Sequence, residues 1–370
     1  MSRKNRPDKF FFGLVVLLAL AGFLVFTSAS LGLLGKSGAS FTLVAVKQGT
    51  ILLVGLAALL GIASIPLTFW KKYALHILIF SALATLLVFI PGLGLSSGGA
   101  KRWILIPLGP MSFSFQPAEL LKIGFIIYLA AWMSGLKEKI TTLDKGFLPF
   151  LVLLAIPGAI LLAQPNTSMF AVIVIASLAM FLVAGGKFKH LAILGLAGVV
   201  ILTGLVFTRP YVKARIMTYI HPQEDVTGSS YQINQALIAI GSGGIFGRGF
   251  GQSVQKFNFL PEPIGDSIFA VAAEEFGLVG SGAIVILFLL FALWGLKISS
   301  KSSDSFGRLL ALGIVILITA QSFINIGAML GLIPLTGAPL IFVSQGGSAL
   351  LLALIEAGII LNISRAKPAK

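Results

Sequence analysis

The dominant pattern along the chain is a series of long apolar runs separated by short polar stretches. A helix needs about 20 mostly apolar residues to cross the hydrocarbon core of a bilayer. The first run is too long for the core of a signal peptide, so we expect it to be an uncleaved span. Ten runs fit the length requirement, and the predicted spans are 10–34, 43–65, 73–93, 117–134, 146–163, 167–184, 191–208, 267–296, 306–332 and 348–363.

The basic residues between these runs predict the orientation. Ten spans place both termini on the same side of the membrane. With that side taken as cytoplasmic, seventeen of the 27 Lys and Arg residues fall in inner segments, and four fall in the short outer loops. Those four are Lys36, Lys47, Lys101 and Arg102. Inner loops are enriched in Lys and Arg, so we expect both termini in the cytoplasm.

Composition supports this class and excludes others. The chain is 57% hydrophobic and 11% charged, and its mean hydropathy is +1.02. Soluble domains carry about 25% charged residues, so residues 1–370 are predicted to form a single all-α, polytopic integral membrane domain. The net charge of +15 lies in clusters between spans, which does not indicate a nucleic-acid partner. There is no cysteine, and the three histidines (His76, His190 and His221) show no metal-ligand spacing.

The unusual sequence lies in the predicted outer loops. Residues 94–115 are too polar and glycine-rich to span, and they contain interfacial aromatic residues. A loop of about 58 residues, 209–266, separates the seventh and eighth spans, and loops of that length are usually functional. The glycine run 241–251 in this loop lacks both the P-loop and the dinucleotide fingerprint. It is either a flexible turn region or a backbone cradle for a phosphate, assisted by Arg248 and Lys256.

Asp266 stands where this loop meets the eighth apolar run, with Glu262 four residues earlier. A carboxylate at the edge of hydrocarbon is costly unless it has a use. One interpretation is a helix cap that accepts N–H bonds from Ile268 or Phe269. The other is a general base whose pKa is raised by burial.

A second set of charges lies inside the spans. Glu119 and Lys122 are three residues apart, so they share a helix face and can pair. The pair is either a functional site or a structural clasp between spans. In the eighth span, helical spacing allows Glu274 but not Glu275 to share a cavity with Asp266. Glu356, in the last span, has no assigned role.

Several motifs in order resemble one known family. They are Gly99-Ala-Lys-Arg-Trp-Ile, Phe115-Gln-Pro-Ala-Glu-Leu-Leu-Lys122, Gln164-Pro-Asn, Tyr231-Gln, the glycine run from Ala236, Phe259-Leu-Pro-Glu, Asp266-Ser-Ile-Phe-Ala, Asn325-Ile-Gly and Pro334-Leu-Thr-Gly. Together with the ten-span layout they resemble the SEDS family (shape, elongation, division and sporulation), which contains the FtsW, RodA and SpoVE proteins. The likeness covers nearly the whole chain.

The resemblance implies a peptidoglycan glycosyltransferase of the bacterial cytoplasmic membrane. Such proteins polymerise lipid II, the undecaprenyl-pyrophosphate-linked disaccharide-pentapeptide, on the outer face, with a class B penicillin-binding protein as the crosslinking partner. The essential aspartate of the family corresponds to Asp266. Three departures from the family pattern occur, at Ile264-Gly265, at Asn166 and at Gln345. The Pro-Glu-Pro that precedes the aspartate favours the division type, FtsW.

The residues are compatible with this chemistry. Asp266 as base would suit a single displacement with inversion. Some of the outward cations could stabilise the charge that develops on pyrophosphate, with or without a Mg²⁺ or Mn²⁺ ion. No ligand cluster identifies a metal site. The candidates for binding substrate or pyrophosphate are Lys101, Arg102, Glu119, Lys122, Arg215, Arg248, Lys256 and Glu262.

Two other functions remain open at this stage. A lipid II flippase or other transporter would explain the many spans and the Glu119–Lys122 pair. Against it, no inverted repeat is visible and the unusual sequence clusters on the outside. A scaffold of a division or elongation complex, with no activity of its own, is the third possibility.

Overall fold

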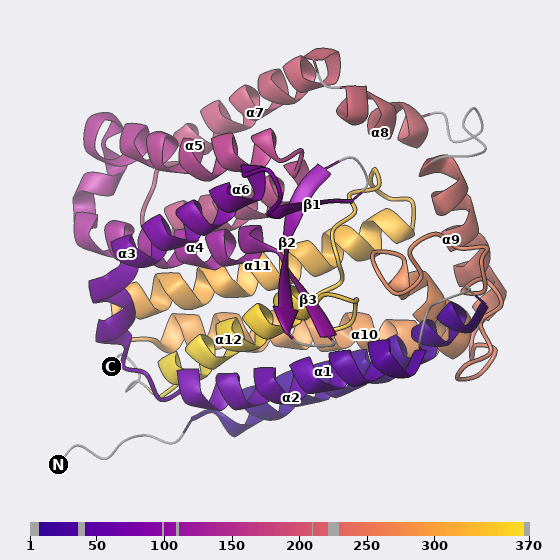
Figure 1. Cartoon of the computed structure of the whole chain (residues 1–370). Helices are drawn as coiled ribbons and strands as arrows, with labels where there is room; N and C mark the ends of the chain where they lie inside the picture. Colours follow the sequence, from indigo (N-terminus) through magenta and orange to yellow (C-terminus); the bar gives the residue numbers. More distant parts are fainter. Residues whose placement is uncertain are drawn as a thin grey trace.

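The computed structural model describes residues 7–35, 41–97, 100–108, 111–208, 210–220 and 229–365. Most of these residues are helical (Figure 1). The α-helices are α1 (Lys9–Ser30), α2 (Phe41–Ile62), α3 (Leu67–Leu86), α4 (Pro117–Leu136), α5 (Leu148–Ala163), α6 (Thr167–Val183), α7 (Phe188–Thr208), α8 (Pro210–Ile220), α9 (Ser229–Gly243), α10 (Ile268–Lys301), α11 (Ser305–Met329) and α12 (Gly347–Ile363). Short 3₁₀ and π turns extend α1, α3 and α4 and precede α5; they are Leu31–Gly35, Leu87–Phe89, Lys137–Thr141 and Leu143–Phe147.

Each of the ten predicted spans coincides with a helix, and α8 and α9 lie in the long loop. Within the described residues, seven helices are long and apolar enough to cross a membrane, and α6 and α12 are shorter apolar helices. The prediction of a helical, multi-pass membrane protein is therefore confirmed.

Helix α11 lies at the centre of the bundle, where it packs against α10, α6 and α4. In its most apolar window 78% of the residues are buried, compared with 28% for α10 and 22% for α2. The two ends of the described chain meet on one side of the bundle, because the Asp8 N–H donates to Ser364 Oγ at 3.0 Å. The Asp8 carboxylate also caps α1 by accepting from the Phe11 N–H at 2.9 Å.

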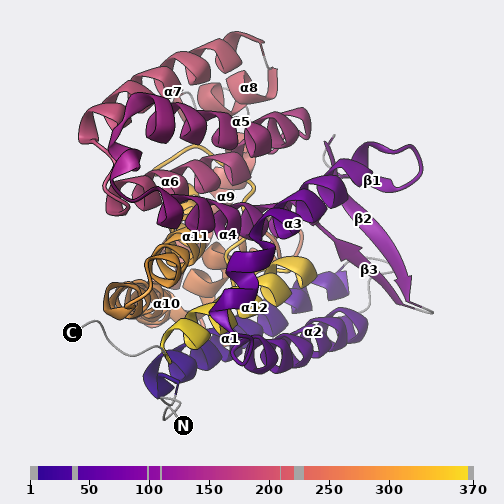
Figure 2. The same cartoon turned by 90° about the vertical axis from the view of Figure 1, so that its left-hand side faces the viewer.

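The fold is not all-α, which corrects the sequence prediction. Residues 94–115 form an antiparallel sheet in the order β1 (Gly94–Ser97), β2 (Ala100–Leu108) and β3 (Met111–Phe115). Figure 2 shows this sheet projecting from one side of the helical bundle. β2 is rich in β-branched and aromatic residues, which favour strands, and Ile104 pairs with both Gly94 and Phe115. The sequence predicted that this segment is interfacial and does not span the membrane. It did not predict that the segment forms paired strands.

Helix α10 is interrupted at Gly277, whose φ of 65° and ψ of −164° are not helical. The glycine run of the long loop docks at this break. The Arg248 and Gly249 N–H groups donate to the carbonyls of Glu274 and Glu275. In return, the Leu278 and Val279 N–H groups donate to the carbonyls of Gly244 and Ile245.

The loop thus supplies backbone partners that an unbroken helix would supply itself. The N–H groups of Arg248 and Gly249 are engaged with α10, and that of Gly251 donates to Ser28 Oγ at 3.0 Å, so these groups do not form the phosphate cradle that one interpretation expected. Gly277 itself requires glycine, since a side chain is strongly disfavoured at a positive φ.

Candidate functional site

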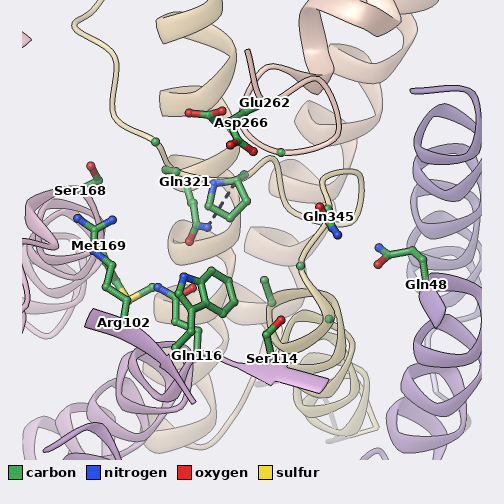
Figure 3. A pocket seen from close by; sticks show the side chains of 18 of the residues that line it. Gln48, Arg102, Ser114, Gln116, Ser168, Met169, Glu262, Asp266, Gln321 and Gln345 are labelled. Carbon is green, nitrogen blue, oxygen red and sulfur yellow. Dashed lines mark hydrogen bonds between the residues drawn. The ribbon is translucent and has the colours of Figure 1, made fainter. Parts of the chain in front are cut away.

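A cavity of ≈ 810 Å³ opens among α2, the sheet, α6, the segment that precedes α10 and the loop that precedes α12. Figure 3 shows its polar side chains converging from several of these elements. The charged lining residues are Lys47, Arg102, Arg215, Glu262 and Asp266. Neutral polar residues complete the polar part of the wall, and these are Gln48, Ser114, Gln116, Asn166, Ser168, Gln321 and Gln345.

The backbone before α10 is fixed to the rest of the protein at three consecutive carbonyls. The Ile264 carbonyl accepts from the Gln345 N–H at 2.7 Å. The Gly265 carbonyl accepts from Ser344 Oγ at 2.7 Å, and the Asp266 carbonyl accepts from Asn325 Nδ2 at 2.7 Å. The position of Asp266 is therefore set by α11 and by the loop before α12.

The Asp266 side chain is partly buried and lines the cavity. Gln232 Nε2, from α9, donates to Asp266 Oδ1 at 3.2 Å. The N-cap of α10 is Ser267, one residue later, so Asp266 is not the helix cap that one interpretation expected. Burial, followed by the negative charge of Glu262, raises the pKa of Asp266 to about 6. A carboxyl group with this pKa is ionised at neutral pH and is basic enough to accept a proton.

Glu262 lies close to Asp266 in the cavity wall (Figure 3). Its backbone has a φ of 48°, an uncommon conformation for a residue other than glycine. The Glu262 carbonyl accepts from the N–H groups of Gly265 and Ser267, which closes a tight turn around Asp266.

Two of the six predicted basic candidates line the cavity, Arg102 and Arg215. Arg102 donates from Nε to the Gln164 carbonyl at 3.2 Å and from Nη2 to the Pro165 carbonyl. Arg215 donates from Nη1 to the Thr336 carbonyl at 3.2 Å. A Cβ atom added at Gly337 would lie 3.6 Å from Arg215 Nη2 and 3.8 Å from Asp266 Oδ2. The guanidinium of Arg215 and the carboxylate of Asp266 therefore face the same small space.

Three of the other four, Lys101, Lys256 and Arg248, do not line this cavity, and their predicted role in binding substrate stays a prediction. Lys101 is an exposed residue of β2 next to Arg102, and neighbouring residues of a strand point to opposite faces. Lys256 is buried, and its Nζ lies 2.7 Å from Glu275 Oε1 and 2.8 Å from the Gly251 carbonyl. Arg248 Nε lies 3.6 Å from Glu274 Oε1.

The carboxylates of Glu274 and Glu275 hold the loop against α10. Glu274 accepts from Ser253 Oγ at 2.5 Å and from the Val254 N–H at 3.0 Å. Glu275 accepts from Ser28 Oγ of α1. The expectation that Glu274 shares the cavity of Asp266 was wrong, because the loop covers it.

Glu119 and Lys122 form a buried ion pair, with Lys122 Nζ 2.6 Å from Glu119 Oε2. The prediction that they lie close enough to hydrogen-bond is confirmed. Neither lines the cavity, but Lys122 Nζ also donates to Gln321 Oε1 at 3.0 Å, and Gln321 does line it. Gln321 in turn donates to the Pro339 carbonyl at 3.4 Å (Figure 3). The pair therefore supports the cavity wall from within the bundle.

Sequence reasoning missed several lining residues. Lys47 was counted only as a charge in a short outer loop, yet it lies in α2 and faces the cavity. Gln48 and Gln321 carry amides on otherwise apolar helices. Polar side chains inside apolar spans were the available signal, because membrane helices bury such groups toward one another.

No group of three or more His, Cys, Asp or Glu side chains that could hold a metal ion occurs in the described residues. The cavity does contribute two carboxylates, Asp266 and Glu262. Mg²⁺ in phosphate-handling sites is commonly held by one or two carboxylates together with substrate phosphates. Two carboxylates alone do not define such a site, so the Mg²⁺ or Mn²⁺ ion stays a prediction to which these residues assign no ligand.

The fold and the cavity define a multi-pass membrane protein with a charged polar site at one end of its helical bundle. The chain belongs to the family of FtsW, RodA and SpoVE proteins, since the family model described as "Cell cycle protein" matches residues 8–368.

Its curated relatives agree with this assignment. Stage V sporulation protein E of Bacillus subtilis is 36% identical over 364 residues, which are 98% of each chain. The probable peptidoglycan glycosyltransferase FtsW of Geobacter metallireducens is 40% identical over 323 residues, 86% of this chain and 84% of the relative. Both sporulation and division proteins are thus similar to this chain, and the predicted preference for the division type stays a prediction.

Solved structures share the fold. A chain of a peptidoglycan synthase complex, described for its coordination of polymerization and crosslinking, superposes with a TM-score of 0.79 at 24% identity over 97% of this chain and 98% of that one. The rod shape determining protein RodA of Thermus thermophilus gives a TM-score of 0.69 at 23% identity over 98% of both chains.

Proposed function

We propose that this chain is a peptidoglycan glycosyltransferase that polymerises lipid II into glycan strands. The observation that carries the proposal is Asp266, a partly buried carboxyl with a pKa of about 6 that faces a cavity also lined by two arginines. The family assignment and the printed activity of the FtsW relatives support it.

In the proposed reaction, Asp266 acts as general base. It accepts the proton of the acceptor sugar's hydroxyl while that oxygen forms a bond to the anomeric carbon of the donor. The bond from that carbon to undecaprenyl pyrophosphate breaks, and its electron pair leaves with the diphosphate. One displacement of this kind inverts the configuration at the anomeric carbon. The proton then passes from Asp266 to water in the cavity.

The cations of the cavity complete the mechanism. Negative charge develops on the diphosphate as it leaves, and preorganised donors stabilise such charge most effectively where water is scarce. Arg215 is the strongest candidate because it faces the same space as Asp266. Arg102 and Lys47 lie on other parts of the wall and would bind the remaining phosphate and sugar oxygens. A Mg²⁺ or Mn²⁺ ion that binds with the substrate, through the diphosphate oxygens, would add further neutralisation of charge.

The topology belongs to the same proposal. We infer that ten helices, α1–α7 and α10–α12, cross the bacterial cytoplasmic membrane with both termini inside, and that the chain forms a single integral domain. The contact between Asp8 and Ser364 supports an even number of crossings, and the positive-inside bias supports the orientation. The cavity would then open on the extracytoplasmic side, where the lipid-linked substrate is presented.

A class B penicillin-binding protein is the proposed partner. The likeness to a chain of a synthase complex that coordinates polymerization with crosslinking supports this choice. Such a partner would crosslink the strand that this chain makes.

The test is incubation of the purified protein with lipid II in detergent, alone and with the partner, followed by analysis of glycan products. Polymer that forms with a transpeptidase-inactive partner supports the proposal. Detergent provides no second leaflet, so polymer formation would also exclude a flippase as the sole function. A folded protein that binds lipid II but makes no polymer in either condition contradicts the enzymatic proposal.

A further inference from the structure

The carboxylate of Asp266 has a neighbour outside its own segment whose contacts suit the control of its orientation. Gln232 lies near the start of α9, and its Nε2 donates to Asp266 Oδ1 at 3.2 Å and to Ser267 Oγ at 2.9 Å. One amide group therefore contacts both the proposed base and the residue that begins α10. Gln232 itself does not line the cavity.

The hydrogen bond from Gln232 restrains the side chain of Asp266, whereas the contacts described above hold the backbone around it. Asn325, Ser344 and the Gln345 N–H all bind carbonyl groups of residues 264–266. The side chain of an aspartate can still rotate about its own bonds when its backbone is held. The hydrogen bond from Gln232 restrains that rotation and leaves Oδ2, which lies beside Gly337, on the side shared with Arg215.

We propose that Gln232 is a positioning residue that orients Asp266, so that one carboxylate oxygen is held by α9 and the other faces the substrate. This inference rests on the proposed function and deepens it. The chemical basis is that an amide N–H group donates to an ionised carboxylate and stabilises it. The amide oxygen of the same side chain would instead repel the carboxylate.

The electrostatic surroundings of Asp266 make the effect measurable. The charged groups that face it are Glu262, from its own segment, and Arg215, from α8. Helix α9 contributes no charged side chain, and neither does the loop of residues 333–347. The contribution of Gln232 is thus a neutral hydrogen bond that favours the ionised form and opposes the effect of Glu262.

The experiment compares pH–rate profiles of lipid II polymerisation for the wild type, Gln232→Leu and Gln232→Glu. Loss of the donated hydrogen bond in the Leu variant should raise the pKa of Asp266. The acid limb of its profile should move up by about one pH unit. The rate should then fall about tenfold well below pH 6 but only about twofold at pH 7, where about half of the base would still be ionised. The Glu variant keeps the volume but places a second carboxylate beside Asp266, so its acid limb should move further in the same direction.

The matched control is Gln235→Leu, the same replacement one turn along α9 at a residue outside the cavity lining. It should leave both the rate and the profile unchanged. If Gln232→Leu lowers the rate equally at every pH, or leaves the rate unchanged, the positioning role is wrong. If the Leu variant does not fold, an unmoved acid limb in the Glu variant overturns the inference by itself. Failure of the proposed function has a different signature, because the wild type itself would then make no polymer at any pH.

Discussion

Asp266 and Lys256 belong to the same long loop, yet their charges are used in different ways. Lys256 is fully enclosed, and its ammonium group contacts Glu275, Ser28 and the Gly251 carbonyl. Asp266 accepts a hydrogen bond from Gln232 and faces a cavity. A buried charge whose contacts are all with protein groups holds the structure together, whereas a buried charge that faces a cavity can act on a ligand.

The same contrast separates the arginines. Arg248 pairs with Glu274 where the long loop packs against α10, outside the cavity. Arg215 donates to the Thr336 carbonyl and faces the space that Asp266 faces. Its charge therefore lies in the wall of the cavity, where an anionic ligand would meet it. The number of charged residues in a loop is thus less informative than where each charge lies.

The largest expected effect is that of Asp266→Asn. The variant cannot accept a proton at neutral pH, so polymerisation should fall about 10²–10⁴-fold, the usual contribution of a general base. Because folding raises the pKa of Asp266, the ionised carboxylate costs folding free energy at neutral pH. Thermal unfolding in detergent should therefore occur at no lower temperature than in the wild type. Near-normal glycan synthesis by this variant would remove the catalytic assignment.

Lys256→Met should act on stability instead. Removal of one partner from a buried ion pair typically costs about 3–5 kcal/mol, because the other charge stays buried without compensation. We expect a marked decrease in the unfolding temperature and in folded yield, with partial recovery in the double variant Lys256→Met/Glu275→Gln. Lys139→Met, at an exposed lysine, is the control. A Lys256 variant with normal stability and weakened lipid II binding would instead show that Lys256 helps to bind the substrate.

Arg215→Met should lower the polymerisation rate about 10–100-fold, the effect of losing a hydrogen bond to a charged group. Since the positive charge of Arg215 lowers the pKa of Asp266, the acid limb of the pH–rate profile should also move to higher pH. Arg248→Met should leave that acid limb in place. Equal shifts of the profile in the two arginine variants would mean that the distinction between them is wrong.

The smallest effect concerns pH in the otherwise intact protein. A base with a pKa of about 6 is half protonated at about pH 6, so the rate should fall roughly tenfold per pH unit below that value and level off above it. The negative charge of Glu262 raises this pKa, and Glu262→Gln should therefore move the acid limb to lower pH. An acid limb that stays in place would show that Glu262 does not act on the base.

Much of the fold follows from the apolar pattern, because a helix that crosses hydrocarbon must be long and apolar over its whole length. The position of Asp266 at the edge of such a run also indicated a site. The sheet was missed because its strands lie among glycines, and β2 carries a continuous apolar run after two basic residues instead of a period-two alternation.

The sequence could not predict which charged residues line the cavity and which pair with Glu274 and Glu275. That division depends on which carboxylate each cation meets, and Lys256 meets Glu275 only because the loop folds back on α10 at Gly277. Lys47 was missed for a related reason, since only the packing of α2 beside the sheet and the loop before α12 directs it into the cavity.

The break at Gly277 also matches α10 to the thickness of a bilayer. At about 1.5 Å per residue, the whole 34-residue helix would be about 51 Å long, well beyond a hydrocarbon core of about 30 Å. The part that follows the break, 278–301, measures about 36 Å and suits that core with a modest tilt. We therefore expect the part that precedes it, from Ile268 to Phe276, to form a separate short helix outside the hydrocarbon core. Its acidic residues, Glu274 and Glu275, would then lie beyond the hydrocarbon, where two adjacent carboxylates are tolerated.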